Sequence, residues 1–211
     1  MRRGFKAEAE RTSTQVRKDM GVGDLANVDA SQFAVHLGIE VRSASDLIDV
    51  SKLEAIDSAQ PGAFSACTFE IGDRRIIVWN PLSLPGRVQS DIAHEVSHIL
   101  LKHSVKEIQQ VGEFSFFACD PEEEQEATWL AGCLLLPRAM LVVDARRNMS
   151  AESIADAHGV SLQMANFRLR TTGVLRQTAS RLRMAAALFG SFMFEVPGFN
   201  LLPSCAKCPI S

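Results

Sequence analysis

The spacing of apolar and polar positions predicts several helices and a small sheet. Residues 4–20 carry charges throughout and are typical of an amphipathic helix. Residues 38–43 alternate as a half-buried strand does, and Asp29 ahead of them is a suitable N-cap for a preceding helix. Within residues 65–80 two strand-like runs meet at a Gly-Asp pair, which predicts a β-hairpin.

Helix breakers divide the rest of the chain. A loop with two prolines and a glycine precedes a helix that we expect to continue to about His103. Asp120 and Pro121 suit the N-cap and first position of a second helix, which a later proline ends. We expect residues 104–119 to be irregular or partly stranded, and residues 150–175 to form two short helices about a glycine.

Composition narrows the class of protein. A chain of 211 residues suits one domain, or one with a small appendage. The net charge of -3 and a pI near 6.0 argue against a general nucleic-acid binder. The charged N-terminal stretch lacks the apolar core of a signal peptide, and no apolar run reaches the roughly 20 residues of a membrane span. Five cysteines without secretory context argue against a disulfide framework, so we expect a cytoplasmic protein.

The candidate chemistry is concentrated in residues 90–103, which hold three of the chain's five histidines. His94 and His98 are four residues apart, so a helix presents both imidazoles on one face to a single ion. Glu95, one position along, would take a proton from a metal-bound water and pass it to a leaving amine. Zinc suits this role because it lowers the pKa of its bound water to roughly 7. The alternative is an ordinary helix whose histidines are solvated or hydrogen-bonded.

His103 is a different case. If the helix runs straight through, His103 lies roughly 180° around it from His94, so we do not expect it to bind the same ion. A metzincin would break the helix at a glycine and place its third histidine further on, and this segment has no such glycine. We predict that His103 is a helix-end or supporting histidine.

The third metal ligand should come from elsewhere, because catalytic zinc typically keeps three protein ligands and one open position. The acidic start of the second helix is the best source, although acids in a first turn also simply favour the helix dipole. Spacing alone does not choose among Glu122, Glu123, Glu124 and Glu126. Glu123 lies at the capping-box position, whereas Glu124 shares a stripe of small residues that could pack on the first helix.

Three segments together resemble the ImmA/IrrE family of metallopeptidases: residues 76–103, 123–141 and 154–175. The family pattern is a strand ending in Asn, an H-E-L-G-H-type helix and an E-x-E-A-N-type helix. The resemblance spans about residues 25–176 and implies an α+β fold of the zincin type, gluzincin-like. In that fold a small β-sheet packs on the HExxH helix, and a helical segment follows at the C-terminal side.

The resemblance also implies a glutamate ligand three residues before the family's alanine, which is Ala127 here, so the ligand would be Glu124. All metal and base positions are intact. The departures are Val96-Ser97 for Leu-Gly, Thr128-Trp129 for Asn and its neighbour, and Leu130 for Phe. These departures lie within the two motif helices.

These residues predict a zinc-dependent endopeptidase with one Zn²⁺, another divalent metal being the alternative. Several members of the family act on helix-turn-helix repressors, and the resemblance implies such a protein substrate and relief of repression of mobile-element or stress genes in bacteria. The alternative is a regulatory protein that holds a repressor or DNA without cutting. The chain has no Tyr to serve as an oxyanion donor. The remaining candidates for that role, or for supporting the site, are His103, Arg138 and His158.

We divide the chain into a metallopeptidase domain (1–145), a helix-turn-helix-like segment (150–180) and an apolar tail (181–211) that ends in a single C-x-x-C. Arg168 and Arg170 on the second helix of the middle segment could contact phosphates. Such helical pairs more often pack or bind a protein partner, so direct DNA binding is the weaker reading. A lone C-x-x-C is weak evidence for zinc, and we expect a flexible tail with free thiols.

Overall fold

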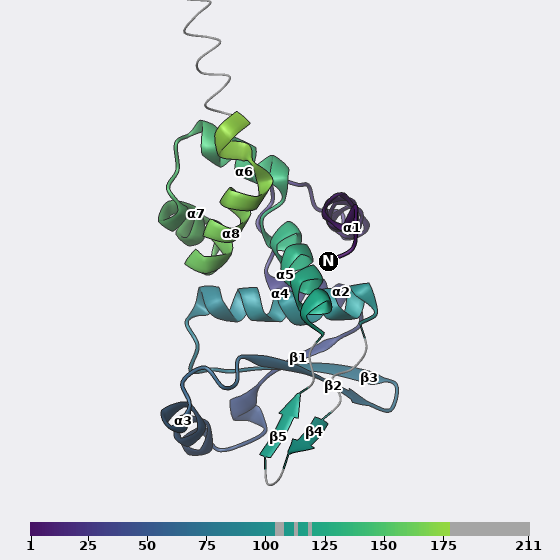
Figure 1. Ribbon diagram of the computed structural model, residues 1–211, viewed down its shortest axis with the longest axis vertical. Helices are drawn as coiled ribbons and strands as arrows, with labels where there is room; N and C mark the ends of the chain where they lie inside the picture. The colour runs from purple at the N-terminus through teal and green to yellow at the C-terminus, as the bar shows by residue number, and fades with distance from the viewer. Residues whose placement is uncertain (104–107, 112–113, 118–119, 178–211) are drawn as a thin grey trace, which may run out of the picture. The chain divides into compact units, whose positions relative to one another are not determined.

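The computed structural model describes residues 1–103, 108–111, 114–117 and 120–177. Residues 1–175 form one unit by their contacts. The elements in chain order are α1 (Phe5–Asp19), α2 (Ala30–His36), β1 (Glu40–Ser43), η1 (Ala44–Asp46), α3 (Val50–Ala59), β2 (Ala66–Ile71), β3 (Arg74–Trp79), α4 (Pro85–Leu101), β4 (Ile108–Val111), β5 (Phe114–Phe117), α5 (Pro121–Leu135), α6 (Arg138–Arg146), α7 (Ala151–His158) and α8 (Leu162–Thr172) (Figure 1).

The sheet contains three strands in the order β1-β3-β2. β3 pairs with β1 in parallel and with β2 in antiparallel orientation. The predicted hairpin is confirmed: β2 and β3 meet at Gly72, whose φ of 59° is costly for other residues. Because β3 is the central strand of the three, β2 lies at an edge of the sheet. β4 and β5 form a separate antiparallel pair, in a stretch that we expected to be only partly stranded.

α4 lies between the sheet and α5, as Figure 1 shows. Its apolar face buries Ile92, Ala93 and Val96 in the main core, which explains how the histidines come to lie on the other side of the helix. The helix ends at Leu101, two residues earlier than expected, because Lys102 takes a left-handed conformation with φ of 56°. The structure thus confirms the α+β class, with a small sheet packed on the HExxH helix.

Buried arginines from two helices hold the C-terminal end of α5. Pro137 stops the helix and leaves its last carbonyl groups without helical partners. The Arg17 guanidinium, from α1, donates to the carbonyl oxygen of Leu134 at 2.7 Å, and Nε of Arg168, from α8, donates to that of Leu136 at 3.0 Å. Both arginines are fully buried. α1 and α8 therefore fix where α5 lies over α4.

Two helices were not predicted. α3 starts at the Asp49 N-cap, whose side chain accepts a hydrogen bond from the backbone of Ser51. α6 starts directly after Pro137, which we had read only as the end of a helix. A proline also suits the start of a helix, because its missing N–H needs no partner there. Only Leu136 and Pro137 therefore separate the two helices.

The pair α7–α8 forms about Gly159, as predicted, and this glycine caps α7 with φ of 63°. The proposal that Arg168 contacts phosphates is wrong, because that side chain is buried against α5. Arg170 is exposed and donates to the carbonyl oxygen of Asn166 in its own helix. The face of α8 that carries Arg168 serves packing.

Ile154 and Met164 share the main core with Phe5, so residues 150–175 pack with the rest of their unit. The division at 145–150 stays a prediction. The predicted tail 181–211 and its C-x-x-C lie outside the described residues, as does Cys119. Of the other predicted core cysteines, Cys133 is buried and Cys67 is half-buried.

Within the described ranges no single helix is both long and apolar enough to cross a membrane. Among the described helices, only α5 and α6 taken together reach that length and apolarity, and they are bent by 60°. Most of α5 is core, including the fully buried Leu130 and Leu134.

Candidate metal centre

Two histidines of α4 and one glutamate of α5 converge on one point. His94 and His98 stand one turn apart on the same face, as the helical period requires. Nε2 of His94 lies 3.0 Å from Nε2 of His98 and 3.1 Å from Oε2 of Glu124. Nε2 of His98 lies 3.5 Å from Oε1 of the same carboxylate. One ligand atom from each residue lies within 4.8 Å of the others, and all three residues are half-buried.

This donor set fits a zinc ion. A tetrahedral ion with bonds of roughly 2.0–2.1 Å separates its ligand atoms by roughly 3.3 Å, close to the spacings seen. Two imidazoles and one carboxylate, with a fourth position open, are also the ligands of a common class of catalytic zinc. A proton on Nε2 of His94 could satisfy only one of its two close contacts, whereas a cation would satisfy all three residues. His94, His98 and Glu124 would therefore hold the metal.

Glu95 follows His94 on α4 and is held by the sheet. The hydroxyl of Thr68 on β2 donates a hydrogen bond of 2.7 Å to Oε2 of Glu95. Glu95 is largely buried, at 7% exposure. Thr68 was missed in the sequence, where nothing marks one strand threonine as the partner of a glutamate 27 residues later.

His103 lies against His98, whereas a helix running straight through to His103 would have turned the two side chains to different sides. Because α4 ends at Leu101, the chain turns back, and the backbone N–H of His103 donates to the carbonyl oxygen of His98 at 3.0 Å. The two rings meet at Nδ1, 3.0 Å apart. Burial, followed by the neighbouring His98, lowers the pKa of His103. His103 is outside the three-residue cluster, and its supporting role stays a prediction.

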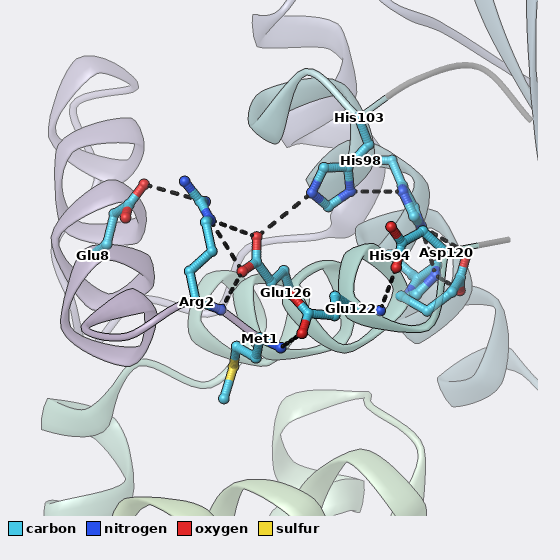
Figure 2. A network of polar contacts seen from close by, with 10 residues as sticks. Met1, Arg2, Glu8, His94, His98, His103, Asp120, Glu122 and Glu126 are labelled. Carbon is cyan, nitrogen blue, oxygen red and sulfur yellow. Dashed lines mark hydrogen bonds and ion pairs between the residues drawn. The ribbon is translucent and has the colours of Figure 1, made fainter.

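Glu126 faces away from the cluster, toward the N-terminal segment (Figure 2). Its Oε1 accepts hydrogen bonds from the backbone N–H of Arg2 at 2.9 Å and from Nε of Arg2 at 3.1 Å. Oε2 lies 3.8 Å from Nε2 of His103. Burial alone would raise the pKa of Glu126, but the hydrogen bonds and charge of Arg2 hold it below the usual value. Of the four acids, only Glu124 joins the two histidines.

The other nitrogen of His94 faces a threonine. Oγ1 of Thr128 lies 3.4 Å from Nδ1 of His94. Thr128 occupies the position where the ImmA/IrrE pattern has Asn, so a hydroxyl stands here in place of an amide. The same residue forms part of a mostly apolar cavity of about 370 Å³ next to Glu124. Its walls are Met1, Glu124, Gln125, Thr128, Trp129 and Phe167.

Two of the candidate oxyanion donors lie elsewhere. Nδ1 of His158 contacts Asn27 at 2.6 Å and its Nε2 contacts Asp144 at 2.8 Å, so both ring nitrogens have structural partners. Arg138 is exposed at the start of α6, beyond the end of α5. With a rise of about 1.5 Å per residue, that end is roughly 16 Å from Glu124. The structure does not bring either residue to the metal ligands.

Comparison with known families agrees with this geometry. The family model of peptidase M78, described as an IrrE N-terminal-like domain, matches residues 35–170. The match includes the sheet, α4 and α5, and hence every residue of the cluster, while α1 and Arg2 lie outside it. No curated protein matches the chain significantly. The family is one of metal-dependent peptidases, and the match covers well over half of the chain. The chain belongs to the M78 peptidase family, with an IrrE N-terminal-like domain.

Proposed function

We propose that the protein is a zinc-dependent endopeptidase in which His94, His98 and Glu124 hold one Zn²⁺. The observation that carries the proposal is the convergence of these ligand atoms, at 3.0–3.5 Å, beside a glutamate that the sheet holds in place. When bound, the ion polarises the scissile carbonyl and makes water a stronger nucleophile. Family membership supports peptidase activity.

Glu95 acts as the general base in this proposal. It takes a proton from the attacking water and transfers it to the amine that leaves when the peptide bond breaks. The hydrogen bond from Thr68 to Oε2 fixes the orientation of this carboxylate. Thr68 thus acts through Glu95, as a positioning residue.

The substrate would bind as an extended strand. β2 lies at the edge of the sheet, and it also carries the hydroxyl that reaches Glu95. A peptide that pairs with this edge through its backbone would pass next to the metal ligands. Such binding requires an unfolded loop or linker in the target protein, because a folded helix has no free backbone groups.

The resemblance to the ImmA/IrrE family suggests the partner: a helix-turn-helix repressor whose cleavage relieves repression of mobile-element or stress genes. The buried position of Arg168 removes one of the two cations that could contact DNA phosphates, which weakens the case for direct DNA binding. We therefore place the action of this protein on the repressor and not on its operator.

The test uses wild-type protein, Glu95→Gln and a control, Glu54→Gln, in which an exposed glutamate of α3 is changed. Each is incubated with zinc and with the repressor encoded next to its gene, and fragments are identified by mass spectrometry. We expect wild type and the control to cut at one site and Glu95→Gln to retain zinc without cutting. Zinc binding with no cleavage by any form would contradict the peptidase proposal and favour a regulatory protein that only holds its partner.

A further inference from the structure

A chain of polar contacts connects the metal ligand His98 to the N-terminal segment. Nδ1 of His98 meets Nδ1 of His103 at 3.0 Å, and Nε2 of His103 lies 3.8 Å from Oε2 of Glu126. Arg2 binds the same carboxylate: its backbone N–H and its Nε donate to Oε1, and Nε also donates to Oε2 at 3.1 Å. Figure 2 shows these residues in sequence, with His103 and Glu126 between the ligand and Arg2.

We propose that His103, Glu126 and Arg2 are positioning residues that orient His98 toward the metal. The proposal depends on the proposed metal site but not on peptide cleavage. Arg2 lies outside residues 35–170, so this chain would use a segment beyond the matched family domain to complete its metal centre.

The direction of the hydrogen bonds follows from metal binding. Nε2 of His98 must offer its lone pair to the ion, so its proton resides on Nδ1. That N–H donates to Nδ1 of His103, which then carries its own proton on Nε2, directed at the carboxylate of Glu126. The distance of 3.8 Å is longer than a direct hydrogen bond, so this last contact is mainly electrostatic.

Each residue in this series of polar contacts is held in place by the next one. The His103 side chain is only 7% exposed and Glu126 only 5%, so neither has bulk water to replace a lost partner. Arg2 is 57% exposed at its side chain, yet it supplies two donors to one buried carboxylate. The Glu126 carboxylate is thereby fixed, and with it the ring of His103.

The two histidine ligands are supported unequally. His94 has a hydroxyl at 3.4 Å from its second nitrogen, whereas His98 has a buried imidazole at 3.0 Å. A partner on the second nitrogen fixes the tautomer and the orientation of a ligating histidine and raises its basicity, and its loss typically costs about 10- to 100-fold in metal affinity. His103 is therefore expected to contribute directly to the binding constant for zinc.

The experiment measures the zinc dissociation constant of the full chain by competition with a chromophoric chelator, with any purification tag at the C-terminal end. His103→Phe keeps the ring bulk but removes both nitrogens, whereas His103→Gln keeps one donor and one acceptor. We expect His103→Phe to weaken zinc binding about 10- to 100-fold. His103→Gln should recover most of this loss, and the absorption bands of bound Co²⁺ should change only in the phenylalanine variant.

Arg2→Ala and Arg3→Ala form a matched pair of exposed arginines, of which the first contacts Glu126. Because the backbone N–H of Arg2 remains, we expect a smaller loss for Arg2→Ala, roughly two- to fivefold, and none for Arg3→Ala. This pair keeps the test decisive if His103→Phe fails to fold.

Three results would overturn the inference: zinc affinity within twofold of wild type in both His103→Phe and Arg2→Ala, equal losses in the two His103 variants, or equal losses in the two arginine variants. Absence of zinc binding by wild type would instead overturn the proposed function together with the inference. Tight wild-type binding with unchanged variants would overturn the inference alone.

Discussion

The hydroxyl of Thr68 on β2 donates a hydrogen bond of 2.7 Å to Oε2 of Glu95 on α4. The contact joins the edge strand of the sheet to the helix that carries the metal-binding histidines. The proposed general base is thereby oriented by the same strand along which we expect the substrate to lie. Binding and chemistry are connected through one side chain.

We predict that Thr68→Val lowers kcat/KM about tenfold or more, because a hydrogen bond to a charged group contributes about 1.5–3 kcal/mol. Valine has nearly the same shape as threonine, so the strand should remain intact. Thr68→Ser keeps the hydroxyl and should retain most of the activity. The measurement is the rate of repressor cleavage, with zinc content determined in parallel. Wild-type activity in the valine variant would show that Glu95 needs no such support.

We predict that Glu124→Ala no longer retains zinc through dialysis, whereas Glu122→Ala does. The first substitution removes one of three ligands, and the second removes an exposed acid from the same helical turn. Elemental analysis of the purified proteins gives the zinc content per chain. Full zinc content in Glu124→Ala would refute the ligand assignment.

Replacing Arg168 by Met should destabilise the metal-free protein by about 2–4 kcal/mol, since the carbonyl oxygen of Leu136 would be left buried without a donor. Arg170→Ala, a change on the exposed side of α8, should stay within about 0.5 kcal/mol of wild type. Urea unfolding in the presence of a chelator measures both. A neutral effect of Arg168→Met would contradict the role of this arginine in holding α5.

The thiol of Cys133 should resist alkylation. Burial raises its pKa to about 12 from 9.0, although the neighbouring Arg168 acts in the opposite direction. At pH 8 the thiolate fraction is then about a thousandfold below that of an ordinary thiol, and the reactive form appears only as pH approaches 12. Iodoacetamide labelling followed by peptide mass spectrometry should modify the half-buried Cys67 well before Cys133. Comparable labelling rates in the native protein would contradict this prediction.

The four acids of α5 show that local sequence patterns could not identify the third metal ligand. Spacing left Glu122, Glu123, Glu124 and Glu126 open as ligands, and only the resemblance favoured Glu124. Two residues along a helix turn the side chain through roughly 200°, so Glu124 and Glu126 face opposite ways. Which of them faces the histidines depends on how α5 packs over α4, and that packing involves α1 and α8.

His103 and Thr68 depended on tertiary structure for the same reason. The residues around Lys102 include no glycine, so the sequence does not predict a left-handed turn there. This turn nevertheless brings His103 to His98. The hydrogen bond between Thr68 and Glu95 arises because the hairpin folds over the helix.

The sequence by itself determined the features that follow from the backbone period and from local turn chemistry. These are the common face of His94 and His98, the hairpin at Gly72 and the N-cap at Asp29. Only the tertiary structure decided which distant side chains complete the site, and that Arg168 lies in the core and not on a nucleic-acid surface. The physical reason is that helices and turns depend on interactions between residues a few positions apart. The metal centre depends instead on the packing of whole elements that lie far apart in the chain.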